Sequence, residues 1–185
     1  FEVHPYDGKI VGETNVNTKN IALIEKSFKG KDTIRFAFVS DSQRWYDELE
    51  AFVKHINQNE DVNFVVHGGD ISDFGLTDEF LWQRDILNGL KQPYVVIVGN
   101  HDYLANGDEI YKKVFGPLNF SFIAGHNKFL CLNTNALEAN YSEPIPNFGF
   151  IKQEKEKNVG EYSNTIALMH AQPTSEQFNN NVSDL

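Results

Sequence analysis

Cysteine, positive charge and long apolar runs are all scarce in this chain of 185 residues. Cys131 is the only cysteine, which excludes an internal disulfide and a cysteine-rich zinc site. Because Cys131 lies in an apolar run, we expect its thiol to be a small buried group. No apolar run reaches the ~18 residues that a transmembrane helix needs, so we expect no transmembrane segment.

Positive charge is outnumbered: 16 basic side chains stand against 26 acidic ones, and the formal net charge is −10. Such a chain lacks the basic surface that binds phosphate backbones, so we expect no nucleic acid partner. If the substrate is a small anion, a bound metal ion is the economical source of the missing positive charge.

The composition is that of a globular protein, with 41% hydrophobic residues and 15 phenylalanines. We predict one domain over residues 1–185, because this length buries a sizeable core. Thr77 is the expected N-cap of one helix. Apolar periodicity predicts strands at 33–40, 62–67, 93–98, 120–124, 128–132 and 165–169, and helices at 17–28, 45–58, 77–88, 108–114, 150–157 and from Thr174. A parallel first half and a hairpin-containing second half predict an α/β fold, with two packed mixed sheets flanked by helices.

Polar side chains follow the first three predicted strands at a regular interval. Asp41 follows the first strand, Asp70 follows the second after two glycines, and Asn100 follows the third. The intervals of 29 and 30 residues each hold one helix and its loops, as a repeated strand–helix–strand unit requires. Because ligands bind at the carboxyl ends of parallel strands, the sequence predicts a site at this edge.

The residue types at the strand ends favour metal chemistry. Asp41, Asp70, Asn100 and the later strand-end His170 form an oxygen and nitrogen ligand set suited to Mn, Fe or Zn. One or two ions are expected, since a shared carboxylate permits a two-metal site that activates water and clamps phosphate oxygens. His101 would donate a proton to the leaving oxygen.

The motifs that carry these residues have a recognisable order. D-x-Q at 41–43, G-D-x-x-D at 69–73, G-N-H-D at 99–102 and then His170 resemble the calcineurin-like metallophosphoesterase family. That family's pattern is D-x-H, G-D-x-x-D, G-N-H-[DE], H and finally G-H-x-H, and the match spans residues 33–173. The resemblance implies a sandwich of two sheets flanked by helices. It also implies a hydrolase that uses a metal-activated water to cleave a phosphomonoester, as a phosphatase does, or a phosphodiester, as a phosphodiesterase does.

The resemblance also implies roles by motif position. Asp41 and Asp70 would hold a first metal ion, while Asp70, Asn100 and His170 would hold a second, and His101 would assist catalysis. Manganese is one of the metals that such a site accepts. Two further carboxylates of these motifs, Asp73 and Asp102, would orient the metal ligands or the His101 ring through hydrogen bonds.

Two departures from the family pattern stand out. Gln43 replaces a metal-binding histidine, and an amide is a weaker ligand, so it would be a weak ligand or a supporting group. No G-H-x-H occurs before Leu185, so we expect the domain to lack its C-terminal portion and the second sheet to be incomplete. An uncovered sheet edge would then promote self-association.

Other interpretations compete with this one. Asp41 alone is also typical of a helix cap, and His170 alone of a buried core histidine. The rival function is a degenerate phosphoesterase-like domain that binds a phosphorylated ligand with weak or no catalysis. A dinucleotide-binding fold is a weaker third idea, because no G-x-G-x-x-G follows the first strand. The opening residues 1–10, together with 15–25, resemble exported bacterial phosphoesterases that follow a lipoprotein signal, which would place the protein in the periplasm or on the cell surface.

Overall fold

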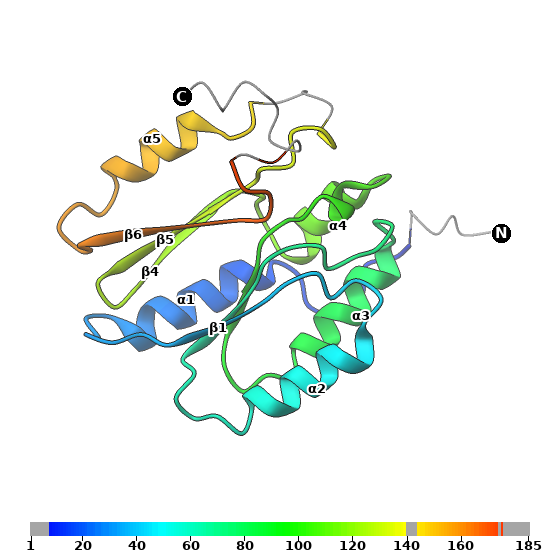
Figure 1. Ribbon diagram of the computed structural model, residues 1–185, viewed down its shortest axis with the longest axis horizontal. Helices are drawn as coiled ribbons and strands as arrows, with labels where there is room; N and C mark the ends of the chain where they lie inside the picture. The colour runs from blue at the N-terminus through cyan, green and yellow to red at the C-terminus, as the bar shows by residue number, and fades with distance from the viewer. Residues whose placement is uncertain (1–7, 140–143, 174, 176–185) are drawn as a thin grey trace.

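The computed structural model describes residues 8–139, 144–173 and 175, and the helix expected from Thr174 lies outside them. Its elements run in chain order as α1 (Val16–Phe28), β1 (Phe36–Val39), α2 (Tyr46–Ile56), β2 (Phe64–His67), α3 (Thr77–Leu87), β3 (Tyr94–Val96), a 3₁₀ turn (His101–Tyr103), α4 (Gly107–Val114), β4 (Phe120–Ala124), β5 (Asn127–Leu132), α5 (Phe148–Glu156) and β6 (Asn164–Met169). Two sheets lie face to face between outer helices (Figure 1). No helix in the described ranges combines the length and apolarity needed to cross a membrane.

The first sheet has the order β1-β2-β3, and all of these strands are parallel. Its strands are rich in β-branched and aromatic residues, and β2 is buried along its whole length. Side chains alternate between faces, so Phe64 and Val66 point toward the second sheet while Val65 lies among the helices. All three strands therefore end at the same edge, as the sequence predicts.

The second sheet has the order β4-β5-β6 and is mixed. β4 and β5 form an antiparallel hairpin whose turn is Gly125-His126, with Gly125 at a φ of +62°. β6 then pairs parallel to β5. This pairing places the carboxyl end of β6, where His170 follows, near the same edge as the ends of the first sheet.

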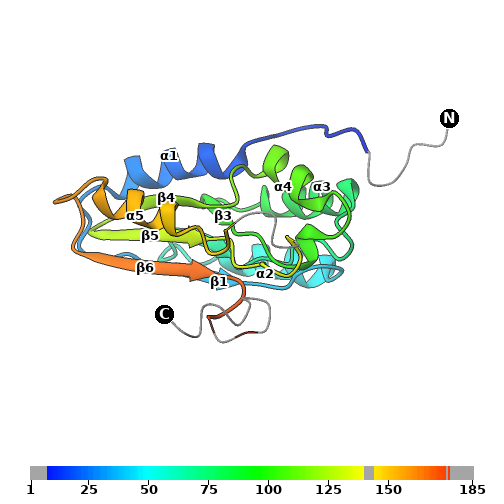
Figure 2. The same cartoon turned by 90° about the horizontal axis from the view of Figure 1, so that it is seen from above.

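Aromatic rings fill the space between the two sheets. Phe64 of β2 lies at the centre of this layer, with its ring centroid 5.3 Å from that of Phe36, 5.7 Å from Phe122 and 5.4 Å from Phe129. These separations are typical of favourable stacked and edge-to-face contacts. Helices α2, α3 and α4 cover the outer face of the first sheet, and α5 covers the second (Figures 1 and 2).

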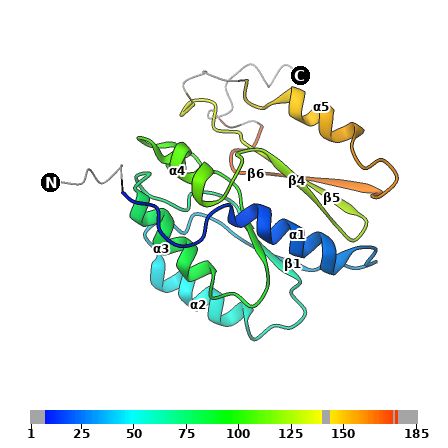
Figure 3. The same ribbon diagram turned by 180° about the vertical axis from the view of Figure 1, so that it is seen from behind.

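Helix α1 closes one side of the sandwich, where it packs on β3 and β4 (Figure 3). Asn17 lies on α1, and its amide nitrogen donates to the Val96 carbonyl at 2.7 Å while its oxygen accepts from the Val96 amide at 2.9 Å. Asn20 adds a bond to the Tyr94 carbonyl at 2.8 Å. These two amides pair with the free edge of β3 as a neighbouring strand would.

One local expectation was wrong by a single residue. Thr77 is not the N-cap of α3 but its first helical residue, because Leu76 holds the extended capping position. The side chain that satisfies the first turn is Glu79, whose Oε2 accepts from the amides of Phe74 and Leu76 at 2.9 and 3.1 Å. The carboxylate of Glu79, the third residue of α3, therefore stabilises the start of this helix, and the Thr77 hydroxyl does not cap it.

Candidate metal centre

The carboxyl ends of the strands bring together side chains that are far apart in the sequence. Ligand atoms of Asp41, Asp70 and His170 all lie within 4.8 Å of one another. Asp41 is exposed, while Asp70 is only 4% exposed and His170 is partly buried. The arrangement therefore has an open side toward solvent and a closed side toward the sheets.

The imidazole of His170 is oriented in a way that typifies metal-binding histidines. Its Nδ1 lies 2.9 Å from the Gly68 carbonyl, which accepts a hydrogen bond, so the neutral ring presents the Nε2 lone pair. That Nε2 lies 3.0 Å from Asn100 Oδ1 and 3.4 Å from Asp70 Oδ1. With a neutral ring, these three acceptor atoms converge with no hydrogen between them, while Asp70 Oδ1 also accepts from the His101 amide, and a cation is what such a cluster accommodates.

Unusual backbone conformations aim the two carboxylates. Asp41 and Asp70 both occupy the left-handed region, with φ values of 58° and 54°. Gly69 precedes Asp70 with a φ of 101°, which favours glycine. A β-carbon on Gly99 would lie only 2.2 Å from Asp70 Oδ1, so the glycine of the G-N-H-D motif makes room for this carboxylate. Backbone strain of this kind is common at functional sites.

Gln43 contacts the site as a hydrogen-bond donor. Its Nε2 donates to Asp70 Oδ2 at 3.2 Å, while its backbone amide donates to the Asp70 carbonyl at 3.1 Å. In this orientation the amide supports Asp70 and points its nitrogen, not its oxygen, at the carboxylate. Of the two roles predicted for Gln43, the contact favours the supporting one.

His101 lies at the rim of the same cluster. Its backbone amide donates to Asp70 Oδ1 at 2.9 Å, and its Nδ1 donates to the Asp73 carbonyl at 2.8 Å, so Nε2 is the ring nitrogen that these bonds leave unused. Burial opposes the charged ring, but the bond to Asp73 and the nearby carboxylates outweigh it and raise the His101 pKa above its usual value. A raised pKa suits a group that donates a proton.

Asp102 stabilises the loops rather than facing the ligand cluster. It is fully buried, and its Oδ1 accepts from the amides of Ile71 and Ser72 while its Oδ2 accepts from the Gly99 amide, all at 2.8 to 2.9 Å. Burial raises the Asp102 pKa to about 7, although these hydrogen bonds act in the opposite direction. The carboxylate ties the loop after β2 to the loop after β3.

A series of buried hydrogen bonds, which the sequence did not predict, ends at the Gln43 carbonyl. The Gly69 amide donates to His67 Nδ1 at 3.3 Å, so His67 Nε2 carries the proton and donates to Ser42 Oγ at 2.8 Å. Ser42 donates in turn to Gln83 Oε1 at 2.8 Å, and the Gln83 amide donates to the Gln43 carbonyl. Burial lowers the His67 pKa to about 4, so the ring stays neutral in this chain. No sequence pattern indicated that Gln83 belongs to this series of hydrogen bonds.

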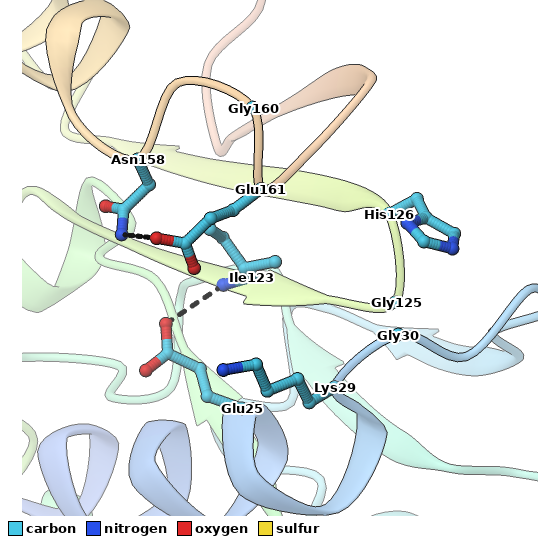
Figure 4. A pocket seen from close by; sticks show the side chains of 9 residues that line it. All are labelled: Glu25, Lys29, Gly30, Ile123, Gly125, His126, Asn158, Gly160 and Glu161. Atoms are coloured by element: carbon cyan, nitrogen blue, oxygen red, sulfur yellow. Dashed lines mark hydrogen bonds between the residues drawn. The ribbon is translucent and has the colours of Figure 1, made fainter.

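A separate hollow of about 470 Å³ lies at the other end of the second sheet, beside the Gly125-His126 turn (Figure 4). Its two carboxylates already have partners, since Glu25 accepts from the Ile123 amide and Glu161 from Asn158. His126 points away from both of them (Figure 4). In the described residues, no group of metal-binding side chains lies in this hollow. We therefore place the functional site at the carboxyl edge of the strands.

Comparison with known proteins agrees with this geometry. No curated protein matches the sequence. The family description "calcineurin-like phosphoesterase" matches residues 34–184, which include every candidate ligand. The matched region covers most of the chain and contains both sheets. The chain therefore belongs to the calcineurin-like phosphoesterase family.

Proposed function

We propose that this protein hydrolyses a small phosphate ester in a metal-dependent reaction. The observation that carries the proposal is the convergence of Asp70 Oδ1, Asn100 Oδ1 and His170 Nε2, three atoms that with a neutral imidazole are all acceptors toward one another. Family membership supports the reaction class. The acidic balance of the chain adds a reason for a metal, because an anionic substrate needs a source of positive charge.

The residues at this edge fit a divalent metal ion. Asp41, Asp70, Asn100 and His170 would hold it, and Mn, Fe or Zn would each suit this set of oxygen and nitrogen donors. Such an ion, when bound, polarises phosphate oxygens and makes water a better nucleophile at neutral pH. Gln43 would keep Asp70 in place through its 3.2 Å hydrogen bond rather than bind the ion.

His101 would act on the leaving group. Its Nδ1 is held by the Asp73 carbonyl, so the ring is oriented and its free Nε2 would donate a proton to the departing oxygen. Its raised pKa keeps the ring protonated at higher pH than an ordinary histidine. Asp102 would contribute indirectly, by fixing the two loops that carry Asp70 and His101.

A second function is supported by a specific observation. Gln43 offers an amide nitrogen to Asp70 where the family pattern has a histidine, so the first metal position has fewer donors. A domain with one weakened position would bind a phosphorylated ligand and turn it over slowly. His101→Ala separates the two functions, because an enzyme would lose turnover whereas a binding domain would keep its affinity for phosphate.

The test is hydrolysis of an aryl phosphomonoester and an aryl phosphodiester with added Mn, Fe or Zn, in wild type and in Asp70→Asn. Asp61→Asn is the matched control, because it makes the same chemical change at an exposed position near the opposite end of β2. We expect Asp70→Asn to abolish metal-dependent turnover and Asp61→Asn to leave it unchanged. Equal activity in wild type and Asp70→Asn would refute the proposed site.

A further inference from the structure

Arg44, in the segment between β1 and α2, contacts the G-D-x-x-D motif that also carries Asp70. Its Nη2 lies 2.9 Å from Asp73 Oδ1 and 2.8 Å from Asp73 Oδ2. The same Asp73 accepts a hydrogen bond from His101 through its carbonyl, and its Oδ1 lies 3.7 Å from His101 Nδ1. One aspartate thus holds both the guanidinium and the imidazole, so the two side chains lie on the same rim.

The guanidinium has donors left over. Only Nη2 is used by Asp73, and Nη1 and Nε have no partner among the described residues. The Arg44 side chain is 63% exposed, whereas the carboxylate that holds it is only 6% exposed. The ion pair therefore has one exposed and one buried partner, and Arg44 compensates a carboxylate that is removed from water. The buried carboxylate in turn holds the guanidinium in place, while the exposed part of the group keeps its free N–H donors.

Arg44 also differs from the other basic side chains in its ion-pair partner. Among the described ion pairs that involve lysine or arginine, only that of Arg44 includes a residue of the metal-centre motifs. Guanidinium groups bind phosphate oxygens through paired N–H donors, which makes arginine suited to this position. The unused donors of Arg44 are therefore available to a substrate phosphate.

We propose that Arg44 binds an anionic oxygen of the substrate phosphate and biases the site toward phosphomonoesters, an inference that rests on the proposed function. A phosphomonoester has three terminal oxygens and a charge of about −1.5 to −2 at pH 7. A phosphodiester has two terminal oxygens and a single charge. A cation beside the metal centre gains more from the third oxygen and the added charge, so Arg44 stabilises the bound monoester more than the bound diester.

The test compares Arg44→Gln with Arg35→Gln, which removes the same charge from an exposed position just before β1, at the other end of that strand. We expect Arg44→Gln to lower kcat/KM for an aryl monoester by about 10- to 100-fold, the effect of one charge-assisted hydrogen bond. The value for an aryl diester should fall less than threefold, and Arg35→Gln should change neither. Arg44→Lys should restore part of the monoester rate, because it keeps the charge but not the paired donors.

An equal fall for both esters would overturn the proposal, because it would mean that Arg44 only positions Asp73 and His101. Unchanged rates for both esters would overturn it as well. If wild type hydrolyses neither ester, the proposed function fails, and calorimetry with inorganic phosphate and the Mn-loaded protein then tests Arg44 separately. In that experiment a roughly tenfold weaker phosphate affinity in Arg44→Gln supports the proposal, and equal affinity overturns it.

Discussion

Adding one methyl group at Gly99 should damage the metal centre without changing any candidate ligand. A β-carbon there would lie 2.1 Å from the Asp70 amide nitrogen and 2.2 Å from Asp70 Oδ1, where real contacts essentially never fall below 3.0 Å. The two loops would have to separate by roughly 1 Å, and overpacking of this kind costs about 1–3 kcal/mol. We expect the free energy of unfolding to fall by about 2–3 kcal/mol in Gly99→Ala, a large part of the 5–15 kcal/mol typical of a domain.

Urea denaturation with linear extrapolation measures this loss, and a Mn titration measures the damage to the site. Gly149→Ala is the matched control, because Gly149 lies in the first turn of α5 and its β-carbon would approach nothing closer than 3.3 Å. That control should be neutral or more stable by up to about 1 kcal/mol, since alanine favours helix over glycine. A Gly99→Ala variant whose free energy of unfolding lies within about 0.5 kcal/mol of wild type, and which binds Mn equally well, would refute this prediction.

Three further predictions concern the stability of the fold. Burial raises the Glu154 pKa, but hydrogen bonds from Lys157, Ser121 and Lys128 outweigh it and lower the pKa to about 2 from an ordinary 4.5. Because the Glu154 pKa is lower in the folded state, the ionised carboxylate stabilises the fold above pH 4.5, and this stabilisation is lost as the pH falls toward 2. The stability gap between wild type and Glu154→Gln, about 2–3 kcal/mol by this reasoning, should therefore close over that range of pH in urea titrations. Asn17→Leu should cost about 2 kcal/mol, because it leaves the buried Val96 amide without a partner, and equal urea midpoints would contradict this. We also propose that residues 1–185 unfold as one domain, which requires a single transition with equal calorimetric and van't Hoff enthalpies.

Much of this architecture follows from local patterns. The apolar runs 120–124 and 128–132 around Gly125-His126-Asn127 predicted the hairpin, which the structure confirms with a two-residue turn at Gly125-His126. The three strand-end motifs predicted the parallel sheet, since their spacing leaves room for one helix each. These features are local, so one sequence suffices to recognise them. The predicted strands of the first sheet were longer than the observed ones, as for 33–40 against Phe36–Val39, because apolar periodicity continues past the last ladder bond, whereas those of the second sheet agree to within one residue.

The connections behind the site could not be predicted in this way. Arg44 meets Asp73 across 29 residues, and Ser42 meets Gln83 across 41, so no periodic pattern links them. Gln43 illustrates the same limit: its residue type suggested a weakened ligand, but only the contact with Asp70 reveals a donor. The sequence identifies which side chains follow strands, whereas long-range packing determines which of them touch.

The position of His170 has a consequence for how the chain is made. Three of the four candidate ligands precede residue 101, but the fourth follows β6, which pairs with the hairpin strand β5. During synthesis, when residues are added at roughly 5–20 per second, Asp41, Asp70 and Asn100 leave the ribosome several seconds before His170. A nascent chain would hold a metal ion only weakly in that interval. Tight binding would begin once the second sheet has docked, so metal occupancy would distinguish finished molecules from partly made ones.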